Sequence, residues 1–82
     1  MLGRPDADDP LRVLTPREHA VLAAMAEGKS NVGIAESLFV SAASVEKHIT
    51  AIFRKLGIAP ASTEHRRVHA VLKYLQGTAG RS

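Results

Sequence analysis

The sequence predicts an all-α domain with about four helices. Three observations support this prediction: apolar residues recur at helical spacing in four segments, each segment begins beside a residue that can cap a helix, and no segment convincingly resembles a strand. The chain has 82 residues, which favours a single domain. A domain of this size buries only about 60% of its unfolded surface, so dimerisation would help to stabilise it.

The first predicted helix has a strong start signal. Residues 1–13 are polar, with two prolines and three aspartates, and predict a flexible linker or tail before a folded domain over 14–76. Thr15 can cap the helix, Pro16 suits its first position, and Glu18 completes a capping box. Apolar residues follow at helical spacing up to Gly28, which predicts a helix over about 16–27.

The second predicted helix is short and begins at Ser30 or Asn31. Its inner face consists of Ile34, Ala35 and Leu38. Phe39 and Val40 make the following turn apolar, and we expect the turn itself to be packed.

The third and fourth predicted helices have regular apolar stripes. Ser41 caps the third, which runs over about 42–56 and places apolar side chains at Val45, Ile49, Ile52, Phe53 and Leu56. The fourth begins at Ser62 or Thr63 and runs over about 63–75, with its stripe at Val68, Val71, Leu72 and Leu75. This second stripe either completes the monomer core or forms a two-fold contact. Residues 77–82 predict a disordered tail.

Composition excludes several classes of function. The chain has no cysteine, which rules out disulfides and thiolate metal sites. No apolar run approaches the roughly 20 residues that span a bilayer, and no signal peptide is visible, so we expect a cytoplasmic protein without a membrane partner. His65 and His69 have metal-binding spacing without an evident third ligand, and we expect no metal. No nucleophile–base–acid set points to an enzyme.

The second and third predicted helices have the pattern of a helix-turn-helix. Such a motif needs a small residue where its helices meet, which is Ala35, and an aliphatic residue about ten positions later, which is Val45. The net charge of +3 suits a polyanion but is also ordinary for a soluble domain.

The outer face of the third predicted helix is the candidate DNA-binding surface. It consists of Ala43, Lys47, Thr50, Ala51 and Arg54, flanked by Ser44, His48 and Lys55. Small side chains allow close approach, Lys47 can reach a guanine edge or a phosphate, and free N–H groups at the helix start suit a phosphate. An ordinary solvated helix face would carry similar residues, so periodicity alone leaves both interpretations open.

Five segments together carry a family resemblance: LTPRE (14–18), AEGKSN (26–31), IAESLFVS (34–41), SVEKHI (44–49) and IFRKLG (52–57). They closely resemble the LuxR-type helix-turn-helix domain, the C-terminal output domain of NarL/FixJ-type response regulators. The resemblance covers residues 14–75, and HRRVHAVL (65–72) is similar to the fourth helix of actinobacterial members.

The resemblance implies a four-helix domain that binds double-stranded promoter DNA as a homodimer and regulates transcription in a two-component system. The third helix would read the major groove, and the fourth would supply most of the dimer contact. RNA polymerase is a further candidate partner. The resemblance implies no cofactor and no small-molecule ligand in this domain.

The predicted DNA-binding residues follow from the outer face and from positions aligned with the family. They are Lys29, Ser30, Asn31, Ala43, Ser44, Val45, Glu46, Lys47, His48, Thr50, Arg54 and Lys55. Lys47 is predicted to choose the sequence, Glu46, Val45 and Ala43 to shape the fit, and the remaining polar residues chiefly to contact phosphates. The predicted dimer interface consists of Val68, Val71, Leu72 and Leu75.

Two departures from the family pattern support an alternative. The family often has lysine where Val32 and Glu46 stand. A chain with a weakened DNA face could instead be a protein-interaction module that heterodimerises with a related regulator and inhibits it. Arg66 and Arg67 lie at the unfavourable end of the fourth predicted helix for cations, which indicates a phosphate or an acid across a dimer as a partner, or merely a solvated face.

Overall fold

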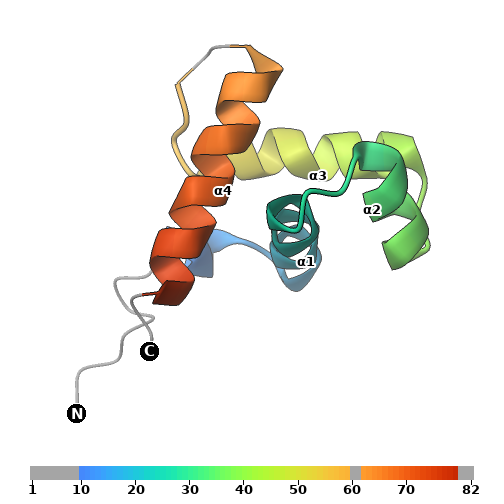
Figure 1. Cartoon of the computed structure of the whole chain (residues 1–82), viewed down its shortest axis with the longest axis horizontal. Coiled ribbons are helices and arrows are strands. Elements are labelled where there is room, and N and C mark those ends of the chain that lie inside the picture. The colour runs from blue at the N-terminus through green and yellow to red at the C-terminus, as the bar shows by residue number, and fades with distance from the viewer. Residues whose placement is uncertain (1–9, 60–61, 80–82) are drawn as a thin grey trace.

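The computed structural model describes residues 10–59 and 62–79. In these ranges a 3-10 turn, η2 (Pro10–Val13), precedes four α-helices: α1 (Pro16–Ala26), α2 (Asn31–Leu38), α3 (Ala42–Lys55) and α4 (Thr63–Ala79). Figure 1 shows α2 near one end of α3, α4 near the other, and α1 against α3 between them. The all-α prediction is confirmed.

The capping box predicted at the start of α1 is formed. The Glu18 backbone N–H donates to Thr15 Oγ1 at 3.1 Å, and the Thr15 N–H donates to Glu18 Oε1 at 2.9 Å. These bonds satisfy donors that would otherwise lack partners at the helix start. Gly28 follows the helix with φ +90°, a left-handed conformation that costs glycine little.

Serine hydroxyl groups cap the N-termini of the next three helices. Ser30 Oγ accepts from Gly33 N at 3.2 Å, and Ser41 Oγ accepts from Ser44 N at 3.1 Å. Ser62 Oγ accepts from His65 N at 3.2 Å and begins α4 in the same way. The sequence therefore predicted these helix starts correctly, because a cap needs only residues three positions apart.

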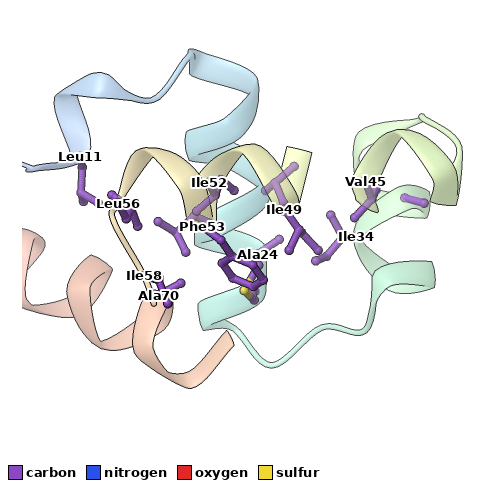
Figure 2. Packing of buried hydrophobic residues seen from close by; sticks show 14 residues of the cluster. Leu11, Ala24, Ile34, Val45, Ile49, Ile52, Phe53, Leu56, Ile58 and Ala70 are labelled. Carbon is purple, nitrogen blue, oxygen red and sulfur yellow. The ribbon is translucent and has the colours of Figure 1, made fainter. Parts of the chain in front are cut away.

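One hydrophobic core joins the four helices. Val21 and Leu22 of α1 pack with Ile34 of α2 and with Val45, Ile49 and Ile52 of α3, and all of them are buried. Ala70 joins the core from α4, and Figure 2 shows it close to Ile58. This packing fixes α3 from its inner side and leaves its outer side uncovered.

The predicted boundaries were wrong at both ends of the domain. Residues 10–13 are not part of a flexible tail, because Leu11 is buried in the core and η2 contacts α4. The fourth helix continues through Ala79, so residues 77–79 are helical rather than disordered. The predicted tail segments 1–9 and 80–82 lie outside the described residues.

The turn between α2 and α3 is only partly packed. Val40 packs against the core, as predicted, but the Phe39 side chain is 94% exposed. Phe39 caps the C-terminus of α2 with φ 58°, ψ 44°, a left-handed conformation. The packed-turn prediction is therefore wrong for Phe39.

Within the described part of the chain, no helix is long and apolar enough to cross a membrane. The same residues contain no group of three or more histidines, aspartates or glutamates arranged to hold a metal ion.

Candidate nucleic-acid interface

Helix α3 has one buried side and one exposed side. The inner stripe of Val45, Ile49, Ile52 and Phe53 is buried, as the periodicity predicted. Val45 has no exposed surface at all, so the prediction that it contacts DNA is wrong. Its place in the core lets it fix the position of the helix without touching a ligand.

The exposed side of α3 forms a shallow concave surface lined by Ala43, Glu46, Lys47, Thr50 and Arg54. Neither the Lys47 side chain nor the Arg54 side chain has a hydrogen-bond or ion-pair partner within residues 10–59 and 62–79. Two unpaired cations therefore stand about two turns apart on an uncovered helix face. Ser44 and His48 are half-buried and flank this face.

The N-terminus of α2 carries the next predicted contacts. Ser30 is exposed but already uses its Oγ as the helix cap. Asn31 is half-buried, and its Oδ1 accepts from Arg67 Nη1 at 2.7 Å. Lys29 pairs with Glu27 between partly exposed side chains, an arrangement that contributes little to stability.

Lys55 has a structural partner that its sequence neighbours do not indicate. Its Nζ lies 2.7 Å from Oε1 of Glu18, the buried carboxylate of the α1 capping box. Burial acts to raise the pKa of Glu18, but hydrogen bonds from Lys55 and Thr15, with the Lys55 charge, outweigh it and hold that pKa below its ordinary value. Lys55 therefore stabilises the α1–α3 junction.

Two arginines at the start of α4 extend the polar surface. Arg67 Nη1 bonds to Asn31, and Arg67 Nη2 donates to the carbonyl oxygen of Lys29 at 3.1 Å. The Arg66 guanidinium lies over the Phe53 ring, with Cζ 4.9 Å from the ring centroid. The groups that bind the Arg67 guanidinium thus belong to its own chain, and not to a phosphate or to a second copy. The predicted DNA-binding set omitted both arginines, although their place at a helix start signalled an unusual environment.

A hollow of about 270 Å³ lies between α2, α3 and α4. Its lining comprises Asn31 of α2, Glu46, Ile49, Thr50 and Phe53 of α3, and Thr63, Arg66 and Arg67 of α4. Glu46 and Thr50 also line the concave outer face of α3, so the two depressions adjoin.

Helix α4 divides the predicted dimer residues between two faces. Ala70 is buried, and Val71 packs against the core. Val68, Leu72 and Leu75 are 59%, 50% and 48% exposed, at i, i+4 and i+7 on one side of the helix. The structure thus leaves a short apolar stripe uncovered on the monomer.

The sequence matches the family model for bacterial regulatory proteins of the luxR family over residues 12–73. It is 40% identical over 76 residues to a nitrate/nitrite response regulator protein homolog of Haemophilus influenzae, covering 93% of this chain and 34% of that protein. It is 45% identical over 53 residues to oxygen regulatory protein NreC of Staphylococcus aureus strain MRSA252, covering 65% of this chain and 24% of that protein. The chain thus spans about a third or less of these curated relatives.

Proposed function

Because the chain belongs to the luxR family of bacterial regulatory proteins and is a helix-turn-helix DNA-binding domain, we propose that α3 enters the major groove of promoter DNA and that two copies bind together through α4. The family is one of transcription regulators and not of enzymes. The similarity to response regulators supports a role as the output domain of such a regulator, in the cytoplasm, with RNA polymerase as a further partner.

The observation that carries the proposal is the exposed face of α3. A recognition helix must be held firmly from behind while its front stays free of other protein elements. Burial of Ile49 and Ile52 provides the first condition. The concave surface provides the second, because the Lys47 and Arg54 side chains on it are unpaired among the described residues.

We assign different roles to the residues around this face. Lys47 contacts a base edge, and Glu46 beside it discriminates among bases by accepting from a cytosine amino group. Thr50 and Ala43 set how closely the helix approaches. Phosphates are bound by Lys29, Ser30, Asn31, Ser44, His48 and Arg54, with Lys55 close to the backbone.

The first test is fluorescence anisotropy of the chain on a mixed pool of duplex DNA, titrated with salt. The logarithm of the binding constant falls linearly with the logarithm of the salt concentration. The slope steepens by about 0.9 for each phosphate that the protein neutralises. We expect a slope of several units, followed by enrichment of a preferred sequence from the pool. Absence of binding at low salt would refute the proposal.

Two substitutions on α3 test the assignment of roles. Lys47→Ala is expected to weaken binding to the selected sequence by about 1–3 kcal/mol and to relax the choice of sequence. Arg54→Ala is expected to weaken selected and random DNA alike. Arg54 is a better phosphate probe than Lys55, because Lys55→Ala would also break the ion pair with Glu18. If each variant lost the same affinity for the selected sequence as for random DNA, the assignment of roles would be contradicted.

The alternative function is heterodimerisation with a related regulator, which this chain would inhibit. The exposed stripe on α4 and the acidic Glu46 on the DNA side of α3 favour it. Mixing the chain with a full-length family member distinguishes the two functions: an inhibitor removes that partner from its operator and shows no DNA binding of its own.

A further inference from the structure

We propose that Arg66, on α4, is a further contact to a DNA backbone phosphate, made in the hollow beside the recognition helix. This inference rests on the proposed function, because it requires α3 to lie in the major groove. It adds a fourth-helix residue to an interface otherwise placed on α2 and α3.

The charge of Arg66 is positioned but not neutralised. Its guanidinium is held over Phe53, at 4.9 Å from the ring centroid. No carboxylate pairs with it and no hydrogen bond engages it within residues 10–59 and 62–79. Its Nε is buried without a hydrogen-bond partner. A fixed cation with unused donors is suited to bind an incoming anion.

Arg67 joins α4 to the segment that begins α2, beside the hollow. Its two bonds, to Asn31 Oδ1 and to the Lys29 carbonyl oxygen, fasten the first turns of α4 to the start of α2. Because Oδ1 accepts from Arg67, the amide nitrogen of Asn31 is left to donate elsewhere. Asn31 and Arg66 line the same hollow and together offer N–H groups from two helices.

The position of the hollow indicates the source of the anion. It shares Glu46 and Thr50 with the outer face of α3. Figure 1 shows the first turns of α4 extending beyond α3 on the side away from α1. A helix in a major groove about 12 Å wide has a sugar–phosphate backbone on either side. The backbone on the α4 side would therefore pass over this hollow.

Charge and space both suit a phosphodiester group. Arg66 and Arg67 contribute two positive charges to the lining, against one negative charge from Glu46. A volume of about 270 Å³ far exceeds the roughly 10–15 Å³ that a cavity needs to hold one water, so the hollow can admit a hydrated phosphate. The carboxylate of Glu46 lies at the junction with the α3 face, which confines an anion to the arginine side.

The test measures the salt dependence of binding to one fixed mixed-sequence duplex for Arg66→Gln, Arg66→Lys and Lys73→Gln. Lys73 lies two turns further along α4 and outside the hollow, so Lys73→Gln removes the same charge from the same helix. For Arg66→Gln we expect the slope to fall by about 0.9 for each bound copy. One lost contact corresponds to about a 3.5-fold smaller change in affinity between 50 and 200 mM salt. Arg66→Lys should retain the wild-type slope, and Lys73→Gln should leave it unchanged.

Two results would overturn this inference. One is an unchanged slope for Arg66→Gln. The other is an equal fall for Arg66→Gln and Lys73→Gln, which would indicate only a general charge effect. If the slope of Arg66→Gln is unchanged but the variant no longer self-associates without DNA, the anion is an acid of a second copy. Failure of the proposed function is separate, because the wild-type chain itself would then show no salt-dependent binding.

Discussion

At the residue scale, Glu18 connects two parts of the fold. Its carboxylate accepts from the Thr15 N–H at the start of α1 and pairs with Lys55 at the end of α3. Because only 6% of its surface is exposed, the charge depends on these partners rather than on water. The bonds hold the pKa of Glu18 below its ordinary value despite burial, so ionised Glu18 stabilises the folded state.

Glu18→Gln tests this coupling. A folded-state pKa below the unfolded value of about 4.3 means that the stabilisation is complete above that pH and is lost as pH falls through the folded pKa. We expect the variant to be about 1–2 kcal/mol less stable than wild type at neutral pH, with the difference shrinking below about pH 4. Urea unfolding followed by circular dichroism measures it. Glu36→Gln, an exposed position on α2, is the control. A difference independent of pH would contradict the ion-pair role.

Sequence reasoning identified half of this arrangement. Thr15 and Glu18 are three residues apart, and that spacing alone predicts the capping box. Lys55 lies 37 residues from Glu18, and only the folded chain brings them together. The same limit applies to Arg67 and Asn31, which are separated by 36 residues. Sequence reasoning therefore predicts Lys55 and Asn31 as DNA contacts but cannot predict their intramolecular bonds.

Phe39 combines an exposed aromatic ring with a left-handed backbone. An L-residue in this conformation costs about 1–2 kcal/mol, and a ring that is 94% exposed recovers little by packing. We expect Phe39→Gly to raise the free energy of unfolding by about 0.5–1 kcal/mol, after allowing for the freer unfolded chain. Phe39→Ala keeps the backbone strain and should give no such gain. A loss of stability in Phe39→Gly would show that the ring packs more than its exposure indicates.

At the element scale, α2 is the shortest of the described α-helices and contains a glycine. A Cβ at Gly33 would meet Lys29 Cβ and Ser30 Oγ at 3.6 Å, which is ordinary contact. Gly57, in contrast, ends α3 with φ +68°, which disfavours a side chain whatever the space. The two glycines thus differ in what they do for their helices.

Substituting both glycines separately tests this difference. Gly33→Ala should stabilise the domain by about 0.5–1 kcal/mol, because alanine loses less backbone entropy in a helix. Gly57→Ala should destabilise it by about 1 kcal/mol or more. Chemical denaturation gives both values. If Gly33→Ala destabilised the domain as much as Gly57→Ala, the packing around α2 would require a residue without a side chain at position 33.

The starts of the helices could be predicted more reliably than their surroundings. Caps and apolar periods lie within a few residues, so the starts of α1, α2 and α3 agree with the expectation. The segment before α1 contains prolines and aspartates typical of a tail, yet Leu11 is buried against elements far along the chain. Local composition could not reveal that burial. Likewise, the resemblance implies a groove contact for Val45, but this side chain is buried in the core.

At the scale of the whole molecule, one face of α4 remains apolar after the core is complete. Val68, Leu72 and Leu75 form this stripe, while Ala70 and Val71 on the other side already pack inward. If this stripe packs against a second copy, each Å² of apolar surface removed from water contributes about 25 cal/mol to the stability of the dimer. A two-fold contact would use the same stripe from both copies.

The double variant Leu72→Gln/Leu75→Gln tests this contact without changing charge. Both side chains are about half exposed, so the monomer should lose little stability. If the stripe forms the dimer interface, sedimentation should show a dimer dissociation constant that is higher by at least about tenfold. Each 1.4 kcal/mol of binding free energy that is lost raises this constant tenfold. DNA should then bind one copy where the wild type binds two. Phe39→Gln changes an exposed apolar residue in the turn that follows α2 and should preserve the wild-type association. A wild-type chain that stays monomeric at high micromolar concentration and also on DNA would exclude α4 as the dimer interface.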